Sequence, residues 1–235
     1  MSTVSDLKLL AIIPAKAGSQ RVAKKNIIDF LGRPLISYTI EAALSSGMLD
    51  RIVVSSESEE VLSVAKCFSG VTEIRRPERL AVDPATVIDV CIHVLDTLQE
   101  TYDYVFIMLP TTPLRTAYDV RNVCRILKEK GPEAVASVTR LPYPLRFAFT
   151  LQEGGEMARA FPGMTKESDS RYVVDNGGIY AVKQKNIRRR ELFPEGTLPY
   201  IMPFWASVDI DTYEDLDMAK AMYCYFVKGI YANGI

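Results

Sequence analysis

Basic side chains follow directly on an apolar run near the start of the chain. The run Leu9–Pro14 leads into IPAKAGSQRVAKKN, which carries Lys16, Arg21, Lys24 and Lys25 among residues with small side chains. Small side chains let a ligand approach backbone N–H groups closely, and successive N–H groups form an anion-binding nest. The loop therefore favours a polyanion such as a nucleoside triphosphate, although it matches neither GxxxxGKS/T nor GxGxxG. A solvated basic loop between a strand and a helix is the alternative.

Two carboxylates near the other end of the chain suit a hard divalent cation. Asp209 and Asp211 flank Ile210 in VDIDTYEDLD, and in a strand over 205–210 residues two apart would point to the same side. Carboxylate oxygens, with water and phosphate oxygens, are ligands of Mg²⁺ or Mn²⁺. Such an ion would neutralise a triphosphate and help pyrophosphate to leave. The alternative is that Asp211 or Thr212 caps the last helix and Asp209 is solvated.

The sequence offers no clear nucleophile for covalent catalysis. Its one histidine, His93, lies in the helical run DVCIHVLDTL, and Cys91 and Cys124 have the apolar helical surroundings of core residues. A reaction that depends on alignment and charge neutralisation needs no such group. The basic loop and the two carboxylates therefore carry the chemical interpretation.

Composition excludes several classes of protein. The 235 residues are 48% hydrophobic with a formal net charge of −1, so no overall basic field points to nucleic acid. No apolar run approaches the roughly 20 residues that span a bilayer, and the start of the chain lacks the features of a signal peptide. Four widely spaced cysteines without a CxxC pair indicate reduced thiols. We therefore expect a cytoplasmic protein.

Strand-like and helix-like runs alternate along the chain. The expected strands are 9–14, 50–55, 71–75, 104–109, 134–139, 178–182 and 205–210. The expected helices are 34–45, 58–68, 85–101, 117–130 and 211–227. This order predicts one α/β domain over 1–235 with a doubly wound, mostly parallel sheet. Ligands of such sheets bind beyond the carboxyl ends of the strands, which is where the basic loop begins.

The segment 142–172 breaks this alternation. It holds three prolines, three glycines and mixed charge, a composition typical of irregular structure. We expect it to form a lid, a hairpin excursion or an arm in an oligomer.

Several stretches, in order along the chain, carry a resemblance to a known family. IPAKAGSQRVAKKN is similar to I-P-A-R-x-G-S-K/Q-x-x-x-x-K-N, the signature of the acylneuraminate cytidylyltransferase (CMP-sialic acid synthetase) family. The others are FLGRPLISYTIEAALSS, VVSSESEEVLSVAK, RRPERLAVDPAT, LPTTPLR, DNGGIYAV and DIDTYEDLDMAK. The resemblance implies a Rossmann-like nucleotidyltransferase that transfers CMP from CTP to the anomeric hydroxyl of a 2-keto acidic sugar and releases pyrophosphate. It also implies a homodimer in which 142–172 is the dimerisation arm that reaches the neighbouring subunit's site.

The resemblance further implies roles for individual residues. The nucleotide-binding residues would be Ala15, Lys16, Ala17, Gly18, Ser19, Lys25, Asn26, Arg76 and Thr86. The catalytic residues would be Lys25, Lys16 and Asp211, and the metal ligands Asp209 and Asp211. The acceptor's carboxylate needs a cation, and the acceptor-binding candidates are Arg115, Lys166, Arg171 and Asn176.

The chain departs from the family pattern at several positions. Lys16 stands where the family usually has arginine, Ala17 where it has glycine, and Leu109 where it has glutamine. In addition, Thr165-Lys166-Glu167 stand where the family has R-R-Q, and Gly178 where it has alanine. Because these two departures and Leu109 lie on the acceptor side, the sugar stays open: sialic, pseudaminic, legionaminic, a deaminated nonulosonic or an octulosonic acid. A CTP-binding dimer partner without turnover is the alternative from another functional class.

Overall fold

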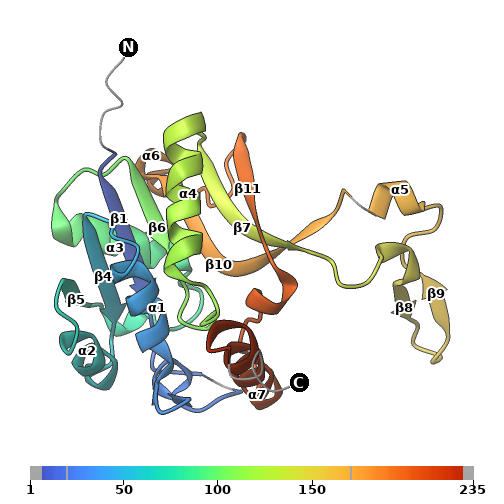
Figure 1. Ribbon diagram of the computed structural model, residues 1–235, viewed down its shortest axis with the longest axis horizontal. Coiled ribbons are helices and arrows are strands. Elements are labelled where there is room, and N and C mark those ends of the chain that lie inside the picture. The colour runs from blue at the N-terminus through green and yellow to red at the C-terminus, as the bar shows by residue number, and fades with distance from the viewer. Residues whose placement is uncertain (1–6, 20, 170, 230–235) are drawn as a thin grey trace.

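A seven-stranded sheet forms the centre of the computed structural model, which describes residues 7–19, 21–169 and 171–229. The strand order is β11-β7-β10-β6-β1-β4-β5 (Figure 1). The strands are β1 (Leu9–Pro14), β4 (Arg51–Ser56), β5 (Val71–Arg75), β6 (Tyr104–Ile107), β7 (Ala134–Arg140), β10 (Val173–Lys183) and β11 (Thr197–Met202). Only β10 runs antiparallel to its neighbours among these strands. The predicted mostly parallel sheet is confirmed.

Helices cover both faces of this sheet (Figure 1). Alternate residues of β1 divide between two cores: Leu9 and Ile13 pack with α1 (Leu35–Leu44), α2 (Glu59–Lys66) and α4 (Ala117–Lys130). Leu10 and Ile12 pack on the other side with α3 (Val87–Leu98) and α6 (Gln184–Arg188). A strand buried on both faces must be apolar throughout, which explains the continuous run in the sequence. The doubly wound arrangement is thus confirmed.

Capping residues in the sequence set where three helices begin. Thr86, Thr116 and Thr212 each cap a helix, and the aspartate three positions later completes a capping box in each case. Such boxes satisfy N–H groups that lack partners at the first turn. Thr212 therefore caps α7 (Tyr213–Met222), which continues into a π-helix over Tyr223–Val227. Gly131, with φ of 57°, ends α4 in the left-handed conformation that favours glycine.

The predicted excursion is a hairpin with a short helix, standing away from the body (Figure 1). It contains a 3₁₀ turn (Leu145–Phe147), β8 (Phe149–Leu151), β9 (Met157–Arg159) and α5 (Lys166–Asp169). We call 142–172 the arm; Ser170 in it lies outside the described residues. The arm is inserted between β7 and β10, which pair with each other at its base.

The prediction of a strand over 205–210 is wrong. Residues Phe204–Ala206 form a 3₁₀ turn and the chain then runs without regular structure to the cap of α7. The apolar alternation is real, because Ala206, Val208 and Ile210 enter a third core. However, the backbone N–H of Ile210 donates to the carbonyl of Thr111 at 2.8 Å instead of joining a strand ladder. The last strand is β11, which the sequence analysis missed.

No helix among the described residues is long and apolar enough to cross a membrane.

Candidate active site

A cleft of about 790 Å³ lies beyond the carboxyl ends of β1, β5 and β6. This is the edge of the sheet where α/β proteins bind their ligands. The cleft gathers most of the residues predicted for the nucleotide. Those that line it are Lys16, Gly18, Ser19, Lys25, Asn26, Arg76 and Thr86. Arg21 and Asp211, the latter predicted as a catalytic residue and metal ligand, line it as well.

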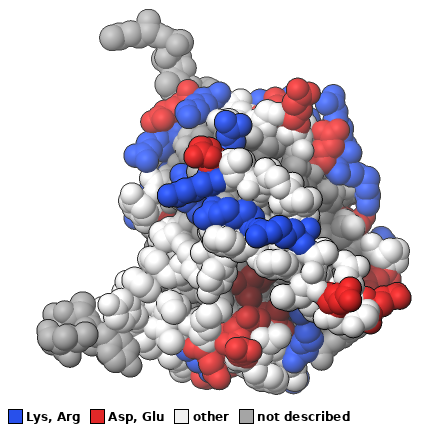
Figure 2. Space-filling model, turned by 90° about the vertical axis from the view of Figure 1, so that its right-hand side faces the viewer, with Lys and Arg blue, Asp and Glu red and all other residues white. Residues whose placement is uncertain are grey.

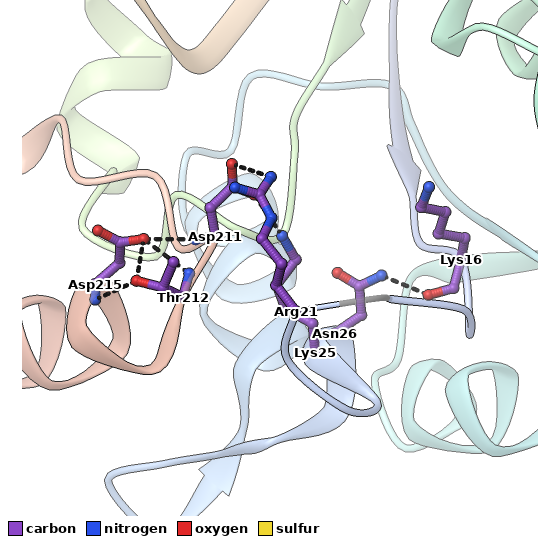
Figure 3. A network of polar contacts seen from close by, with 7 residues as sticks. All are labelled: Lys16, Arg21, Lys25, Asn26, Asp211, Thr212 and Asp215. Carbon is purple, nitrogen blue, oxygen red and sulfur yellow. Dashed lines mark hydrogen bonds and ion pairs between the residues drawn. The ribbon is translucent and has the colours of Figure 1, made fainter. Parts of the chain in front are cut away.

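The basic loop between β1 and the 3₁₀ turn Lys25–Ile27 is folded back on itself. The buried side chain of Asn26 donates from Nδ2 to the carbonyl oxygen of Lys16 at 2.7 Å (Figure 3). Lys24 adopts the left-handed conformation with φ of 47°, and its ammonium pairs with Glu60. Lys24 is not part of the cleft lining. Lys16 does line the cleft; it is exposed, and its ammonium has no partner among the described residues.

The anion nest expected at Ala15 and Ala17 is not formed. The N–H of Ala15 donates to the carbonyl of Ser55 at 3.0 Å, and the N–H of Ala17 donates to the carboxylate of Glu57 at 2.6 Å. Both N–H groups are engaged by the protein, and the contact of Ala15 and Ala17 with phosphate stays a prediction. The groups that the structure leaves facing the cleft are the side chain of Lys16 and the residues Gly18 and Ser19.

Lys25 and Arg21 both pair with Asp211 (Figure 3). Lys25 Nζ lies 2.9 Å from Asp211 Oδ1, and Arg21 Nη2 lies 2.8 Å from Oδ2. The hydrogen bond from Lys25, with the charges of Lys25 and Arg21, lowers the pKa of Asp211 below its usual value. The backbone N–H of Asp211 donates to Asp215, which also caps α7. The last helix thus fixes one side of the cleft.

Asp209 lies on the irregular segment before α7 and not on a strand. The expectation that strand geometry points Asp209 and Asp211 to the same side is therefore wrong. One carboxylate oxygen of Asp209 lies 3.7 Å from the position a Cβ would take at Gly177. The side chain of Asp209 reaches solvent, yet partial loss of hydration raises its pKa above the usual value. The charge of Asp211 raises this pKa further, whereas a hydrogen bond from Thr111 lowers it. Asp209 therefore lies near enough to Asp211 to be affected by its charge, but Asp209 is not part of the cleft lining.

The two aspartates fit a divalent cation that takes its remaining ligands from elsewhere. Within the described ranges, no cluster of three or more His, Cys, Asp or Glu could hold a metal ion. Magnesium usually keeps several waters and binds through one or two carboxylates plus substrate phosphates. Both oxygens of Asp211 pair with cationic side chains, so a metal ion would bind there only if Lys25 and Arg21 turned to the phosphates of a triphosphate.

Arg115 is engaged by the protein. It is 2% exposed, and its guanidinium donates to the carbonyls of Leu109 and Gly178 and to the hydroxyls of Thr112 and Thr39. Burial lowers the pKa of Arg115, but a guanidinium stays protonated in proteins. This side chain ties together the segments behind the cleft, and the predicted acceptor contact, which would require Arg115 to give up these bonds, stays a prediction.

Asn176 is also engaged by the protein. Its Oδ1 accepts from Ser137 Oγ at 2.6 Å and from the N–H of Gly178 at 3.1 Å, while Nδ2 donates to Ser207 Oγ at 2.8 Å. These bonds hold the irregular part of β10 to β7 and to the segment before α7. A direct acceptor contact by Asn176 would require some of these bonds to break, and it stays a prediction.

The two remaining acceptor candidates lie on the arm. Lys166 is in α5 and Arg171 follows it, both exposed. Figure 1 shows that α5 stands far from the body that holds this chain's own cleft. The structure does not bring Lys166 and Arg171 together with the other predicted residues of the same chain.

The groups considered for covalent chemistry lie elsewhere. Cys91 and Cys124 are buried, as expected of core residues. His93, on α3, is not part of the cleft lining.

Glu57, which holds the N–H of Ala17, was not among the predicted site residues. It follows β4 directly, and an acidic residue at the carboxyl end of a buried strand was the signal available in the sequence.

Comparisons with known proteins agree on one family. The chain matches a model described as Cytidylyltransferase over residues 10–141. It is 32% identical to pseudaminic acid cytidylyltransferase from Campylobacter jejuni, over 92% of this chain and 97% of that protein. It is 31% identical to N-acylneuraminate cytidylyltransferase from Escherichia coli, over 90% of this chain and 51% of that protein. A solved structure of CMP:2-keto-3-deoxy-manno-octonic acid synthetase complexed with CTP superposes on this chain with a TM-score of 0.70. The superposition covers 93% of this chain and 99% of that one at 17% sequence identity, so the two share the fold.

Proposed function

Because this chain belongs to the cytidylyltransferase family, we propose that it transfers CMP from CTP to the anomeric hydroxyl of a nonulosonic acid, a 2-keto acidic sugar, and releases pyrophosphate. Relatives that match most of the chain are named for pseudaminic, N-acylneuraminic and N,N'-diacetyllegionaminic acid. The observation that carries the proposal is the cleft at the carboxyl end of the sheet, which is lined by Lys16, Lys25 and Arg21 and in which the last two pair with Asp211. Such a cleft suits a triphosphate better than an uncharged ligand.

The proposed reaction is a displacement at the α-phosphorus. The acceptor oxygen bonds to phosphorus, the bond to the pyrophosphate oxygen breaks, and the acceptor's proton leaves to base or solvent. Lys25, whose side chain is only 15% exposed, would hold phosphate oxygens in a poorly hydrated position where its charge acts strongly. Lys16, whose ammonium has no partner in the described part of the chain, would contact the triphosphate from the loop. Asp209 and Asp211 would hold Mg²⁺ or Mn²⁺, which neutralises phosphate charge when bound.

The arm supports a homodimer as part of this proposal. Its hairpin exposes Phe149, Leu151 and Met157 on one face, and an isolated two-stranded hairpin is at best marginally stable in water. Figure 2 looks at the side from which the arm projects and shows Lys and Arg side chains in a band across it. In a dimer, Lys166 and Arg171 would reach the partner's cleft and contact the acceptor's carboxylate.

A pyrophosphate-release assay tests the proposal. The full chain is incubated with CTP, Mg²⁺ and each of several 2-keto acidic sugars, including pseudaminic, N-acetylneuraminic and an octulosonic acid. We expect release that requires all three components, stops with EDTA and is strongest with a nonulosonic acid. Binding of CTP without release for any sugar would instead favour the alternative of a dimer partner without turnover.

A further inference from the structure

A buried ion pair lies behind the basic loop. Glu57 Oε2 accepts from Arg76 Nη2 at 2.8 Å and from Arg76 Nε at 3.0 Å. The two side chains are 6% and 3% exposed. Glu57 comes directly after β4 and Arg76 directly after β5, so the pair joins two neighbouring strands at their carboxyl ends.

The other oxygen of Glu57 reaches the loop. Glu57 Oε1 accepts from the backbone N–H of Ala17 at 2.6 Å. Because β4 lies between β1 and β5 in the sheet, Glu57 stands between the loop that follows β1 and Arg76 on the far side. One carboxylate therefore fixes the middle of the loop and one wall of the cleft at the same time.

Stability alone does not explain this pair. Burying two charges costs free energy that their mutual attraction barely recovers. A pair of apolar residues of similar size often gives a protein that is equally stable. What an apolar pair cannot supply is an acceptor for the N–H of Ala17. The loop carries Lys16 and Gly18 on either side of this residue, and both line the cleft.

We propose that Glu57 is a positioning residue: it holds Ala17 so that the loop presents Lys16 and Gly18 to the nucleotide, while Arg76 fixes the carboxylate of Glu57. This role rests on the proposed function, since it assumes that the cleft binds CTP. Glu57 itself touches no substrate in this account, because both of its oxygens are engaged by Ala17 and Arg76.

Glu57→Gln is the most direct test. A glutamine keeps the shape but offers its one oxygen to only one of the two donors. Losing a hydrogen bond to a charged group costs about 1.5–3 kcal/mol, so we expect the Kd for CTP, measured by calorimetry on the full chain, to rise by about tenfold or more. In steady-state assays the KM for CTP should rise while kcat and the KM for the sugar change little. Glu60→Gln is the matched control, since Glu60 is a nearby exposed acid that pairs with Lys24.

Amide hydrogen exchange supplies a readout that does not depend on nucleotide. In Glu57→Gln the Ala17 amide should exchange faster than in the unaltered chain, and in Glu60→Gln it should not. If Glu57→Gln does not fold, the double variant Glu57→Met with Arg76→Met replaces the charges with apolar groups. It should fold with a nearly unchanged Tm yet still show fast exchange at Ala17.

The outcomes separate the two proposals. If the unaltered chain bound no CTP, the proposed function would fall and this role for Glu57 with it. If the unaltered chain bound CTP and Glu57→Gln bound it equally well, with unchanged exchange at Ala17, only the role of Glu57 would be overturned. Weaker binding with faster exchange at Ala17 supports both.

Discussion

Lys25 Nζ lies 2.9 Å from Asp211 Oδ1, although 186 positions separate the two residues in the chain. The contact joins the loop after the first strand to the segment that caps the last helix (Figure 3). Both residues line the cleft. A triphosphate that binds there must therefore meet a cation and a carboxylate that are already held in place.

Replacing Lys25 should abolish most activity with little loss of stability. We expect Lys25→Met to lower CTP-dependent pyrophosphate release by about 100-fold or more, because a preorganised charge at the reacting phosphate is lost. The ion pair with Asp211 is partly exposed, so the free energy of unfolding should change by about 1 kcal/mol or less. Lys24→Met is the control, since Lys24 pairs with Glu60 outside the cleft lining. Similar losses in the two variants would contradict a special role for Lys25.

Arg115 should matter for stability more than for acceptor affinity. Arg115→Met removes the guanidinium that donates to the carbonyl of Gly178 and to the buried hydroxyls of Thr112 and Thr39, and we expect a loss of about 3 kcal/mol in urea unfolding. Arg121→Met, which removes an exposed arginine bonded only to the carbonyl of Ser45, should cost about 0.5 kcal/mol. A higher KM for the sugar at unchanged stability would show instead that Arg115 binds the acceptor.

Gly178 cannot accept even one methyl group without strain. A Cβ there would lie 2.9 Å from Ser137 Oγ and 3.1 Å from Asn176 Oδ1. Ser137 Oγ cannot easily move, because it also accepts from the N–H of Ile179 at 2.6 Å. We expect Gly178→Ala to lower the free energy of unfolding by about 1–3 kcal/mol, as overpacking usually does.

Gly154→Ala is the control for this substitution, because a Cβ at Gly154 would meet no atom within 4 Å. Thermal unfolding of both variants provides the measurement. Equal Tm values for the two would mean that the contact between β10 and Ser137 relaxes freely.

The sequence was sufficient for most of the fold, because the strands and helices carry strong local patterns. The predicted bounds of β1, β5 and α4 match the structure. β11 was missed because it is an edge strand with Pro199 at its centre and only Met202 fully buried. A proline is tolerated at an edge, where one side of the strand needs no ladder partner, so the breaker signal was misleading.

The predicted site residues also fall into those that the sequence could place at the cleft and those that it could not. Residues whose charged side chains line the cleft, such as Lys16, Lys25 and Asp211, could be predicted from their types and order. Arg115 and Asn176 could not be placed, because a sequence shows that a polar group is present but not which way it points. The same holds for the N–H of Ala17, whose partner comes from another strand.

The arm should be required for dimer formation. Phe149 and Leu151 lie two apart on β8 and share one side of the hairpin. We expect the double variant Phe149→Glu with Leu151→Glu to be a monomer in sedimentation velocity, and the unaltered chain to be a dimer. Thr150→Glu with Gln152→Glu places the same two charges on the other side and should remain dimeric. If the unaltered chain sediments as a monomer, the proposed dimer is wrong.

Asp89 should make part of the chain's stability sensitive to acid. Hydrogen bonds from the Thr86 hydroxyl and N–H, together with Arg190, lower the pKa of Asp89 to about 2, against about 3.9 in an unfolded chain. The ionised form is thus favoured by folding, so its contribution is fully present above about pH 4 and is lost as the pH falls towards about 2. We expect Asp89→Asn to be less stable than the unaltered chain at pH 7, and this difference in urea midpoint to shrink between about pH 4 and pH 2. Asp96→Asn is the control, since Asp96 lies on the same helix and also pairs with an arginine; its difference in urea midpoint from the unaltered chain should change less with pH. A difference in urea midpoint that stays constant for Asp89→Asn between about pH 4 and pH 2 would contradict the lowered pKa.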